Sequence, residues 1–381
     1  YEDRVVTVEF EGAGPTNRYV PESYDTIEDA LVAAWSGDTI VLAPRADEPY
    51  LISSPDGINF DGKQLVLTST DPNDPLIRAK TVLDLQGSRY NSKRAFHFES
   101  GEDASSVIEG ITIRNAFTAV IGPSAVLETG RWPWHDGLLG VPPDPWNEVD
   151  PDPDPLPPFR ALSGMDATGD SYGGAVLCEN GSSPTIRKCV FEDCTVAGGI
   201  GGDGADGYWQ PVGNKPDGDW DGVSGGHSGK GTGDGYGGAI AVRSESNPQI
   251  IDCEFRNNRA TGGWGGIPGD GGEAGGNGRW SWGGNDFVGL AYAATVVPGT
   301  NDWFEGGNGE GDGHGGAIYV EQGCDPTIAR CKFEDNYARP GYVSPGGTAG
   351  AGEVYPEPFD AAAPPVAWGE QGMRDGNDGI L

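Results

Sequence analysis

The chain has 381 residues, of which 65 are glycine and 30 are proline, and its formal net charge is −34. That charge disfavours binding to nucleic acid and to anionic membranes, because both need clustered Lys and Arg. The sequence also contains no continuous apolar run of the roughly 18 residues needed to span a membrane. With 11 Trp, 13 Tyr and 12 Phe, the composition predicts an ordered core interrupted by glycine-rich loops.

The N-terminal region predicts a cap for a larger fold. Its first residues, YEDRVVTVEF, have neither the basic start nor the apolar core of a signal peptide, so an exported protein would already have lost its signal. Residues 24–44, YDTIEDALVAAWSGDTIVLAP, predict an amphipathic helix that Asp25 caps with Glu28 three residues later. Gly37 ends the helix before a strand over residues 39–42. The apolar face of the helix would hold Ile27, Ala30, Leu31 and Ala34.

Three later segments repeat one another without a gap over 22 positions. They are GGAVLCENGSSPTIRKCVFEDC from Gly173, GGAIAVRSESNPQIIDCEFRNN from Gly237 and GGAIYVEQGCDPTIARCKFEDN from Gly315. An internal repeat of this kind decides the whole fold. The matching positions recur at fixed offsets, which chance does not explain: Pro184, Pro248 and Pro326; Ile186, Ile250 and Ile328; Cys189, Cys253 and Cys331; and Phe191, Phe255 and Phe333.

Each repeat predicts a strand, a polar turn with proline and a second strand, with too few residues for a helix between them. One repeat cannot bury its apolar side chains alone, whereas stacked repeats bury a continuous core with strands about 4.8 Å apart. Residues 62–75, GKQLVLTSTDPNDP, supply a further strand and turn. Residues 94–116, RAFHFESGEDASSVIEGITIRNA, look like another repeat with isoleucine at its apolar places: Ile108, Ile111 and Ile113.

The repeats and residues 24–118 resemble the right-handed parallel β-helix repeat proteins of the pectin-lyase-like superfamily, of the secreted bacterial type. The resemblance implies an all-β fold: a right-handed single-stranded parallel β-helix, or solenoid, with a short N-terminal capping helix and long Gly- and Pro-rich loop insertions. It implies one domain over residues 1–381. Its parts would be the cap and first coils at 1–93, a coil at 94–118, a proline-rich insertion at 119–170, and three repeat coils with glycine-rich insertions and a partial last coil at 171–381.

Long insertions separate the repeats, which start 64 and then 78 residues apart. They cover residues 119–170, 198–236, 262–313 and 339–376 and hold every tryptophan except Trp35. Because a disordered segment rarely carries so many tryptophans, we expect partly ordered loops along one side of the helix. Exposed rings have two interpretations, stacking on sugars or anchoring of loops and subunit contacts, of which we favour the second. The residues concerned are Trp132, Trp134, Trp280 and Trp282.

A Gly-His-Gly triplet at His314 is typical of glycan hydrolases of the polygalacturonase branch, which share the fold that the resemblance implies. Those enzymes also need an adjacent Asp-Asp pair among their carboxylates, and this sequence has none. Tyr172 and Tyr236 precede the same Gly-Gly in the other repeats, so we interpret His314 as a ring packed at a repeat corner. A pectate-type lyase would need a calcium cluster beside an arginine, and no spacing marks one out. We therefore predict no catalytic residue; the arginines on or near predicted strands are Arg187, Arg243 and Arg256.

The acidic composition favours cations as small partners, although acid also simply keeps an extracellular protein soluble. One segment is more specific: GGDGADGYW, residues 201–209, matches the calcium-binding nonapeptide with Asp206 as ligand and Tyr208 inward. Such motifs normally work in tandem, and the sequence has one copy. We predict calcium as a cofactor, bound in the glycine-rich segment by Asp203, Asp206, Asp217, Asp219 and Asp221.

The six cysteines do not have zinc-ribbon spacing. Cys189, Cys253 and Cys331 share one offset, so we expect a row of small side chains facing the core. Neighbours in the row would be about 4.8 Å apart, which allows one disulfide if export exposes the row to an oxidant. Asn180 heads the one N-x-S/T sequon and is a candidate glycosylation site in a turn.

The last residues, RDGNDGIL, resemble the start of one more coil, so either the chain continues or a strand edge is left open. Because open edges of stacked sheets pair with other chains, we expect a homo-oligomer or polymer. Our leading hypothesis is a secreted or cell-surface structural protein that self-assembles into an extracellular filament or matrix. The alternative is a polysaccharide lyase or hydrolase, or a carbohydrate-binding protein, acting on acidic glycans. We expect neither nucleic-acid binding nor membrane insertion.

Overall fold

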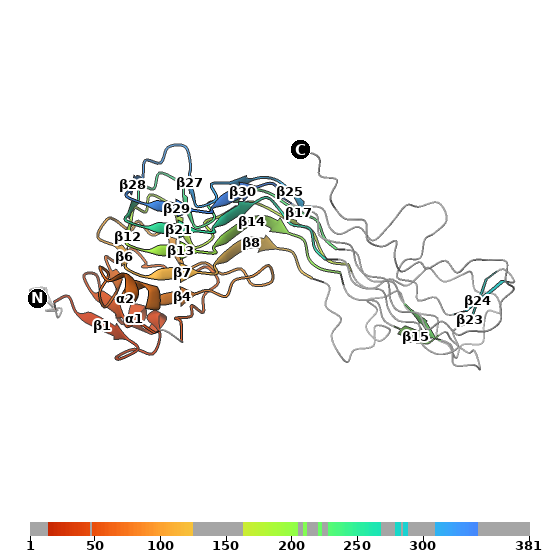
Figure 1. Cartoon of the computed structure of the whole chain (residues 1–381), viewed down its shortest axis with the longest axis horizontal. Coiled ribbons are helices and arrows are strands. Elements are labelled where there is room, and N and C mark those ends of the chain that lie inside the picture. Colours follow the sequence, from red (N-terminus) through yellow and green to blue (C-terminus); the bar gives the residue numbers. More distant parts are fainter. Residues whose placement is uncertain are drawn as a thin grey trace, which may run out of the picture.

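The computed structural model describes residues 14–45, 48–124, 163–204, 228–267 and 309–341, together with the backbone of four strands between these ranges. Within them the protein is all-β, with parallel strands stacked into sheets and two short helices (Figure 1). Neither helix is long and apolar enough to cross a membrane. The expected all-β class and stacked parallel strands are therefore confirmed at this level.

Three parallel sheets line the core of the stack. The largest holds β1 (Asn17–Val20), β2 (Thr39–Leu42), β3 (Val66–Ser69), β6 (Val107–Glu109), β12 (Thr185–Arg187), β20 (Gln249–Ile251) and β28 (Thr327–Ala329). The second holds β4 (Val82–Asp84), β7 (Thr112–Arg114), β13 (Val190–Glu192), β21 (Glu254–Arg256) and β29 (Lys332–Glu334). The third holds β5 (Phe96–Phe98), β11 (Val176–Cys178), β19 (Ile240–Val242) and β27 (Ile318–Val320).

Further sheets extend the stack sideways, at the ends of the expected insertions. Parallel ones hold β8 (Phe117–Ile121), β14 (Thr195–Ile200), β22 (Arg259–Thr261) and β30 (Tyr337–Arg339); β9 (Ala167–Thr168), β17 (Gly231–Thr232) and β25 (Gly309–Glu310); and β10 (Ser171–Tyr172), β18 (Gly235–Tyr236) and β26 (Gly313–His314). The repeats are thus longer than the sequence predicted. Two further pairs are antiparallel, and the structure describes their backbone alone. They join β15 (Trp209–Pro211) to β16 (Trp220–Gly222) and β23 (Arg279–Trp282) to β24 (Asn285–Val288).

One register runs through the repeats. Ile186 of β12 lies opposite Ile108 of β6 and Ile250 of β20. Ile250 in turn lies opposite Ile328 of β28. Equivalent residues are 64 apart in sequence between two repeats and 78 apart between the next two, yet the pairing does not shift. Because a slip of one residue would turn the apolar side chains outward, burial of one face fixes this register.

A tight corner joins the two core strands of each repeat. Lys188, Asp252 and Arg330 occupy it with φ of 52°, 54° and 54°, in the left-handed region. The cysteine that follows the corner then points back into the core, where Cys189 and Cys253 are fully buried. The corner therefore explains why a cysteine that faces the core directly precedes the second strand of each repeat.

Close packing of backbones explains the paired glycines that open each repeat. A Cβ atom on Gly174 would lie 2.1 Å from the carbonyl oxygen of Gly238, and one on Gly238 would lie 2.0 Å from that of Gly316. Real Cβ atoms do not approach that closely, so the second position of each Gly-Gly pair requires glycine. The Gly-Gly-Ala signature is a consequence of stacking.

The helix α1 (Ile27–Ala33) covers the N-terminal end of the stack. Ile27, Ala30 and Leu31 are buried in the main core, as the sequence predicted. The expected cap at Asp25 is wrong by one residue: Thr26 precedes the helix with extended φ and ψ, and its hydroxyl accepts a hydrogen bond from the Asp29 amide at 3.1 Å. The helix begins at Ile27, so Thr26 is the residue placed to reach that amide.

Asp38, between α1 and β2, links several residues at this end of the stack through hydrogen bonds. Its carboxylate accepts hydrogen bonds from the amides of Thr16 and Trp35 and pairs with Arg18 at 2.7 Å. Burial by itself raises the pKa of Asp38, but these hydrogen bonds hold it well below its ordinary value.

A second helix, α2 (Pro75–Lys80), forms where the sequence predicted a turn. Asp74 caps it by accepting a hydrogen bond from the Leu76 amide at 2.8 Å, and Pro75 occupies the first helical position. Proline is favoured there because its missing N–H would have no partner in any case. The Asp-Pro pair was therefore a helix start as well as a turn signal.

The last described repeat, at the other end of the stack, leaves its core positions open. Ile250 and Phe255 in the middle repeat are fully buried, whereas Ile328 and Phe333 at the same places are 43% and 51% exposed. Val320 and Tyr337 in this repeat are also exposed. The strands β27, β28 and β29 lie at the edge of their sheets (Figure 1).

Candidate functional site

The predicted core rows lie on successive repeats. The rings of Phe191, Phe255 and Phe333 stack with centroids 5.0 Å apart at each step. Ile186 and Ile250 are fully buried beside them, and Ile328 continues the row to the exposed end. These rows pack the repeats against one another. Side chains that could bind a ligand are therefore to be found on the outer face.

All six cysteines are free thiols. In the row, Cys189, Cys253 and Cys331 each donate a weak hydrogen bond to a carbonyl of the repeat below, at 3.7, 3.6 and 3.5 Å. Burial raises the pKa of Cys194, which lies beyond the row in the same repeat, to about 12. The buried, protonated thiol of Cys194 is therefore a core side chain, not a nucleophile. In the row, a hydrogen bond with Cys253 lowers the pKa of the half-buried Cys331 thiol to about 6.

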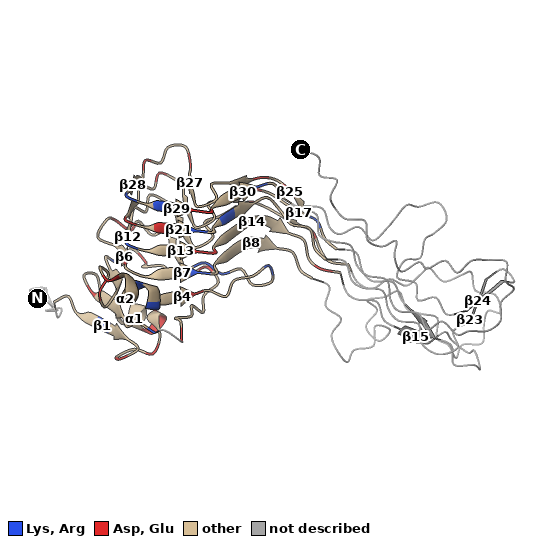
Figure 2. Cartoon of the chain, in the orientation of Figure 1, with Lys and Arg blue, Asp and Glu red and all other residues tan. Residues whose placement is uncertain are grey.

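Lys and Arg lie close to Asp and Glu along the strands and turns of the stack (Figure 2), and several of these residues form ion pairs between successive layers. Arg187 on β12 binds Glu109 on β6 at 2.9 Å, and Arg256 pairs with Glu254 within β21. Two of the three arginines that a lyase would draw on are thus held by acidic partners in the described structure. The third, Arg243, lies 3.8 Å from Glu179 and also against the face of an aromatic ring.

That ring belongs to a row of aromatic side chains on β10, β18 and β26. Tyr172 stacks on Tyr236 with centroids 4.8 Å apart, and Tyr236 stacks on His314 at 4.7 Å. The Arg243 guanidinium lies 4.1 Å from the centre of the Tyr172 ring, a cation–π distance. His314 therefore continues a row of tyrosines, in the register that the sequence alignment gave.

Asp234 connects the upper part of the aromatic row. Its carboxylate accepts a hydrogen bond from the Tyr236 hydroxyl at 3.0 Å and lies 3.4 Å from Nε2 of His314. A hydrogen bond from the Asp312 amide, together with those from Tyr236 and His314, holds the pKa of Asp234 below its ordinary value. Asp234 is therefore the fixed negative charge of the row.

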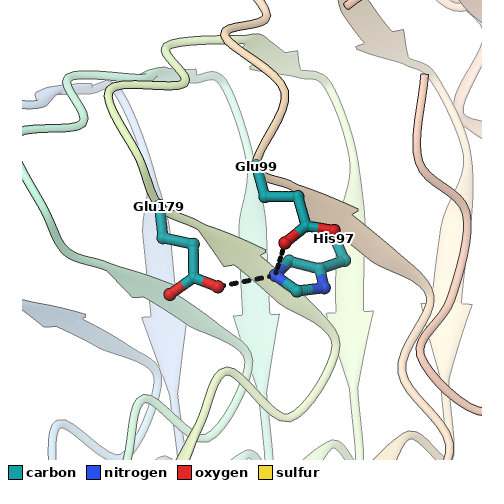
Figure 3. Close-up of side chains that lie close together, drawn as sticks. All are labelled: His97, Glu99 and Glu179. Carbon is teal, nitrogen blue, oxygen red and sulfur yellow. Dashed lines mark hydrogen bonds and ion pairs between the residues drawn. The ribbon is translucent and has the colours of Figure 1, made fainter. Parts of the chain in front are cut away.

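Below this row, the outer face of β5 and β11 carries a histidine between two carboxylates (Figure 3). Nε2 of His97 lies 2.9 Å from Oε1 of Glu179 and 3.7 Å from Oε2 of Glu99. One ligand atom from each residue lies within 4.8 Å of the others. Within the described ranges, this is the one group of three such side chains close enough to hold a metal ion.

The strands fix this cluster, which we call the His97 cluster (His97, Glu99 and Glu179). Phe96 and Phe98 are fully buried on either side of His97, so strand alternation turns the imidazole outward. Glu179 directly follows β11, whose Cys178 lies opposite Phe98. Both acidic side chains therefore leave the ends of neighbouring strands toward the same ring.

A buried arginine, Arg94, interacts electrostatically with the cluster. Arg94 donates to the carbonyl oxygens of Tyr172 at 2.7 Å and Gly173 at 3.2 Å. Burial lowers its pKa to about 10, an effect that the carboxylates of Asp56, Glu179 and Glu99 oppose. Arg94 therefore stays charged at neutral pH and balances part of the negative charge of the cluster.

Sequence reasoning missed the His97 cluster, although one signal was present. The alignment that matches Ile108 with Ile186 places Glu99 opposite Leu177. The pairing of Glu99 with Glu179 appears only in the sheets, because β5 and β6 are separated by two more residues than β11 and β12. Position 97 is leucine or alanine in the next two repeats, at Leu177 and Ala241. A histidine in a row of apolar residues was the feature to notice.

The predicted calcium ligands fall mostly outside the described residues. Asp203 is described: its Oδ1 accepts hydrogen bonds from Arg89 at 2.9 Å and from the Ile267 amide at 2.7 Å. Asp206, Asp217 and Asp219 lie outside, and Asp221 is known as a backbone position in β16 opposite Gln210. Calcium in this segment stays a prediction.

The predicted surface residues have a similar outcome. Trp132 and Trp134 lie outside the described residues, and Trp280 and Trp282 are placed by backbone alone, in β23. Asn180 is exposed in a left-handed turn with φ of 56°. An exposed turn is compatible with glycosylation but does not establish it.

Comparison with family models, curated proteins and solved structures found no match. The functional argument therefore rests on the geometry of this chain.

Proposed function

We propose that the chain is a right-handed parallel β-helix of the pectin-lyase-like type that serves as a secreted or cell-surface structural subunit and self-assembles end to end. The observation that carries the proposal is the open end of the stack, where Ile328 and Phe333 are about half exposed. Their equivalents Ile250 and Phe255 are fully buried by the next repeat. A further layer of β-structure would bury the open positions in the same way.

The opposite end supports a head-to-tail arrangement. There α1 buries Ile27 and Leu31 and leaves Val32 and Trp35 among the most exposed large apolar side chains, at 85% and 78%. Exposed apolar groups at both ends of one molecule match a heterologous contact, which repeats without closing and builds a filament. Burying them would contribute favourable free energy of the hydrophobic kind.

Sedimentation and electron microscopy of the purified chain at neutral pH, with and without calcium, test this proposal. We expect oligomers or filaments that grow with concentration. Phe333→Asp at the open end and Trp35→Asp at the helix end should each dissociate them. Leu76→Asp, which places the same charge at an exposed leucine on α2, is the matched control and should assemble normally. Monomers at all concentrations, or loss of assembly in all three variants alike, would refute end-to-end stacking.

A second candidate function is binding or cleavage of acidic glycans, and the aromatic row favours it. The half-buried rings of Tyr172, Tyr236 and His314 form one strip beside the Arg243 guanidinium, which offers a charge for a carboxylate. Because the ring faces stack on one another, a sugar would meet the ring edges and the tyrosine hydroxyls. The chain's own net charge of −34 opposes the approach of a polyanion unless cations screen it.

This second function is tested by titrating the protein with polygalacturonate and with a neutral glucan, with calcium present or absent, while following absorbance of unsaturated products. Tyr172→Ala and Arg243→Gln should weaken polygalacturonate binding if the row is the site. Equal affinity of these variants and the wild type would remove the aromatic row as a binding site, and absence of product would remove the lyase.

A further inference from the structure

The His97 cluster is independent of the proposed assembly. We infer that His97, Glu99 and Glu179 form a binding site for one divalent transition-metal ion of the zinc or cobalt type. The same three side chains could instead form only a hydrogen-bonded histidine between two acids. Four features of the cluster favour a metal site: its distances, its rigid strands, its charge and its ligand types.

The separations between the ligand atoms fit one bound ion. Zinc binds imidazole nitrogen at about 2.0–2.1 Å and carboxylate oxygen at about 2.0–2.2 Å, so two ligand atoms of a tetrahedral site lie roughly 3.4 Å apart. The two measured separations from Nε2 of His97, 2.9 Å to Glu179 and 3.7 Å to Glu99, lie on either side of that value. The ligand atoms of the two carboxylates lie within 4.8 Å of each other, so the three residues are close enough to share one ion.

Paired strands hold two of the three ligands in place. His97 is locked between two fully buried phenylalanines in the middle of β5, and Glu179 follows a strand paired with β5 in register. Metal sites built on strands hold their ligands more closely than sites on loops. Glu99 is the freest of the three, since its side chain is 43% exposed and Asn59 contacts its other oxygen at 3.4 Å.

The negative charge of the cluster favours a cation. Two carboxylates and a neutral imidazole carry two negative charges, which the Arg94 guanidinium offsets only in part. Arg243 approaches Glu179 to 3.8 Å without a hydrogen bond from its buried Nε. This arginine also lies against Tyr172, so it is not committed to Glu179. A bound dication would replace its weak attraction to the carboxylate, with Arg243 retained by the ring.

The types of ligand favour a transition metal over calcium. An imidazole with two carboxylates suits zinc, cobalt, iron or nickel, whereas calcium takes oxygen ligands and would leave Nε2 unused. Binding needs the Nε2 lone pair, so the neutral ring would carry its proton on Nδ1 and the Glu179 hydrogen bond would be given up. The site is therefore distinct from the calcium predicted for the glycine-rich segment.

Calorimetric titration of the full chain with zinc chloride, and with cobalt chloride while the visible spectrum is recorded, tests the inference. We expect one saturable ion per chain and a four-coordinate cobalt spectrum. His97→Gln and Glu179→Gln should each weaken binding by about 10-fold or more, and Glu99→Gln by less, because even residues that only orient metal ligands are worth about 10–100-fold. Calcium chloride should not compete.

Two controls keep the result specific. His314→Gln removes the other described histidine that lies beside an acid, and Glu192→Gln removes a half-buried carboxylate from the neighbouring sheet; both should bind the ion as the wild type does. Circular dichroism of each variant confirms folding, and Glu99→Gln, at the exposed rim, serves if the buried variants do not fold. No saturable binding, binding unchanged in all three cluster variants, or an intense thiolate-to-cobalt band would overturn the inference.

Discussion

The two ends of the stack solve the same problem in different ways. At the N-terminal end, α1 lays an apolar face over the core and buries Ile27 and Leu31. At the other end, the last described repeat offers Ile328 and Phe333 in the positions that the repeats below use for packing. A helix cannot continue a parallel sheet, whereas an uncovered repeat can be continued by another strand.

The contrast shows that one residue type at one repeat position does not have one energetic value. Phe255 and Phe333 occupy the same place, in register and with stacked rings, yet only Phe255 is enclosed on both sides. What a side chain contributes depends on whether a layer follows it. Three sets of substitutions sharpen this comparison.

The largest effect is expected in the middle of the stack. Phe255→Ala should lower the free energy of unfolding by about 3–5 kcal/mol, because it removes a fully buried ring and leaves a cavity. Phe333→Ala should cost less than about 1 kcal/mol in the monomer, since half of that ring is already in water. Urea denaturation at low protein concentration measures both. Equal costs would mean that the open end is covered in solution.

The cap should follow with a somewhat smaller effect. Ile27→Ala removes a buried side chain of α1 and should cost about 2–4 kcal/mol. Val32→Ala, on the exposed side of the same helix, should change stability by no more than about 0.5 kcal/mol. The same denaturation experiment compares them. If the two variants are equally stable, α1 does not hold the N-terminal end closed.

The smallest of the three effects depends on pH. The pKa of Asp38 is held below its ordinary value, so its contribution is fully present above about pH 4 and is lost as the pH falls further. Asp38→Asn should therefore cost about 2 kcal/mol at pH 7 and progressively less in acid. Asp61→Asn, at an exposed left-handed position that asparagine tolerates, is the control. A penalty for Asp38→Asn that does not change with pH would contradict the role of its charge.

Much of the fold could be predicted from the sequence because the repeat is encoded at fixed offsets. Ile186, Ile250 and Ile328 recur at one offset, and the same residues pair in the sheet. The boundaries of local elements were less accurate. Thr26, not Asp25, caps α1, and α2 was missed, because a cap is decided by which amide a side chain reaches.

The His97 cluster could not be predicted with the same ease. His97 and Glu179 are 82 residues apart in sequence, and they meet only when β5 and β11 are paired. The ungapped repeat alignment does not place Glu99 over Glu179, and it gives no reason to examine position 97, whose equivalents in the next two repeats are Leu177 and Ala241. Sites of this kind arise where one repeat departs from the others, so deviations from the consensus carry the functional signal.

The constant register has a consequence for how such a chain can change. Equivalent residues of adjacent repeats are separated by 64 residues in one case and 78 in the other, and the same strands still pair. The core therefore sets no length for the chain that leaves at one corner and returns to the next repeat. Insertions and deletions there should be tolerated in evolution and in protein engineering, and foreign segments should be exchangeable between repeats without redesign of the core.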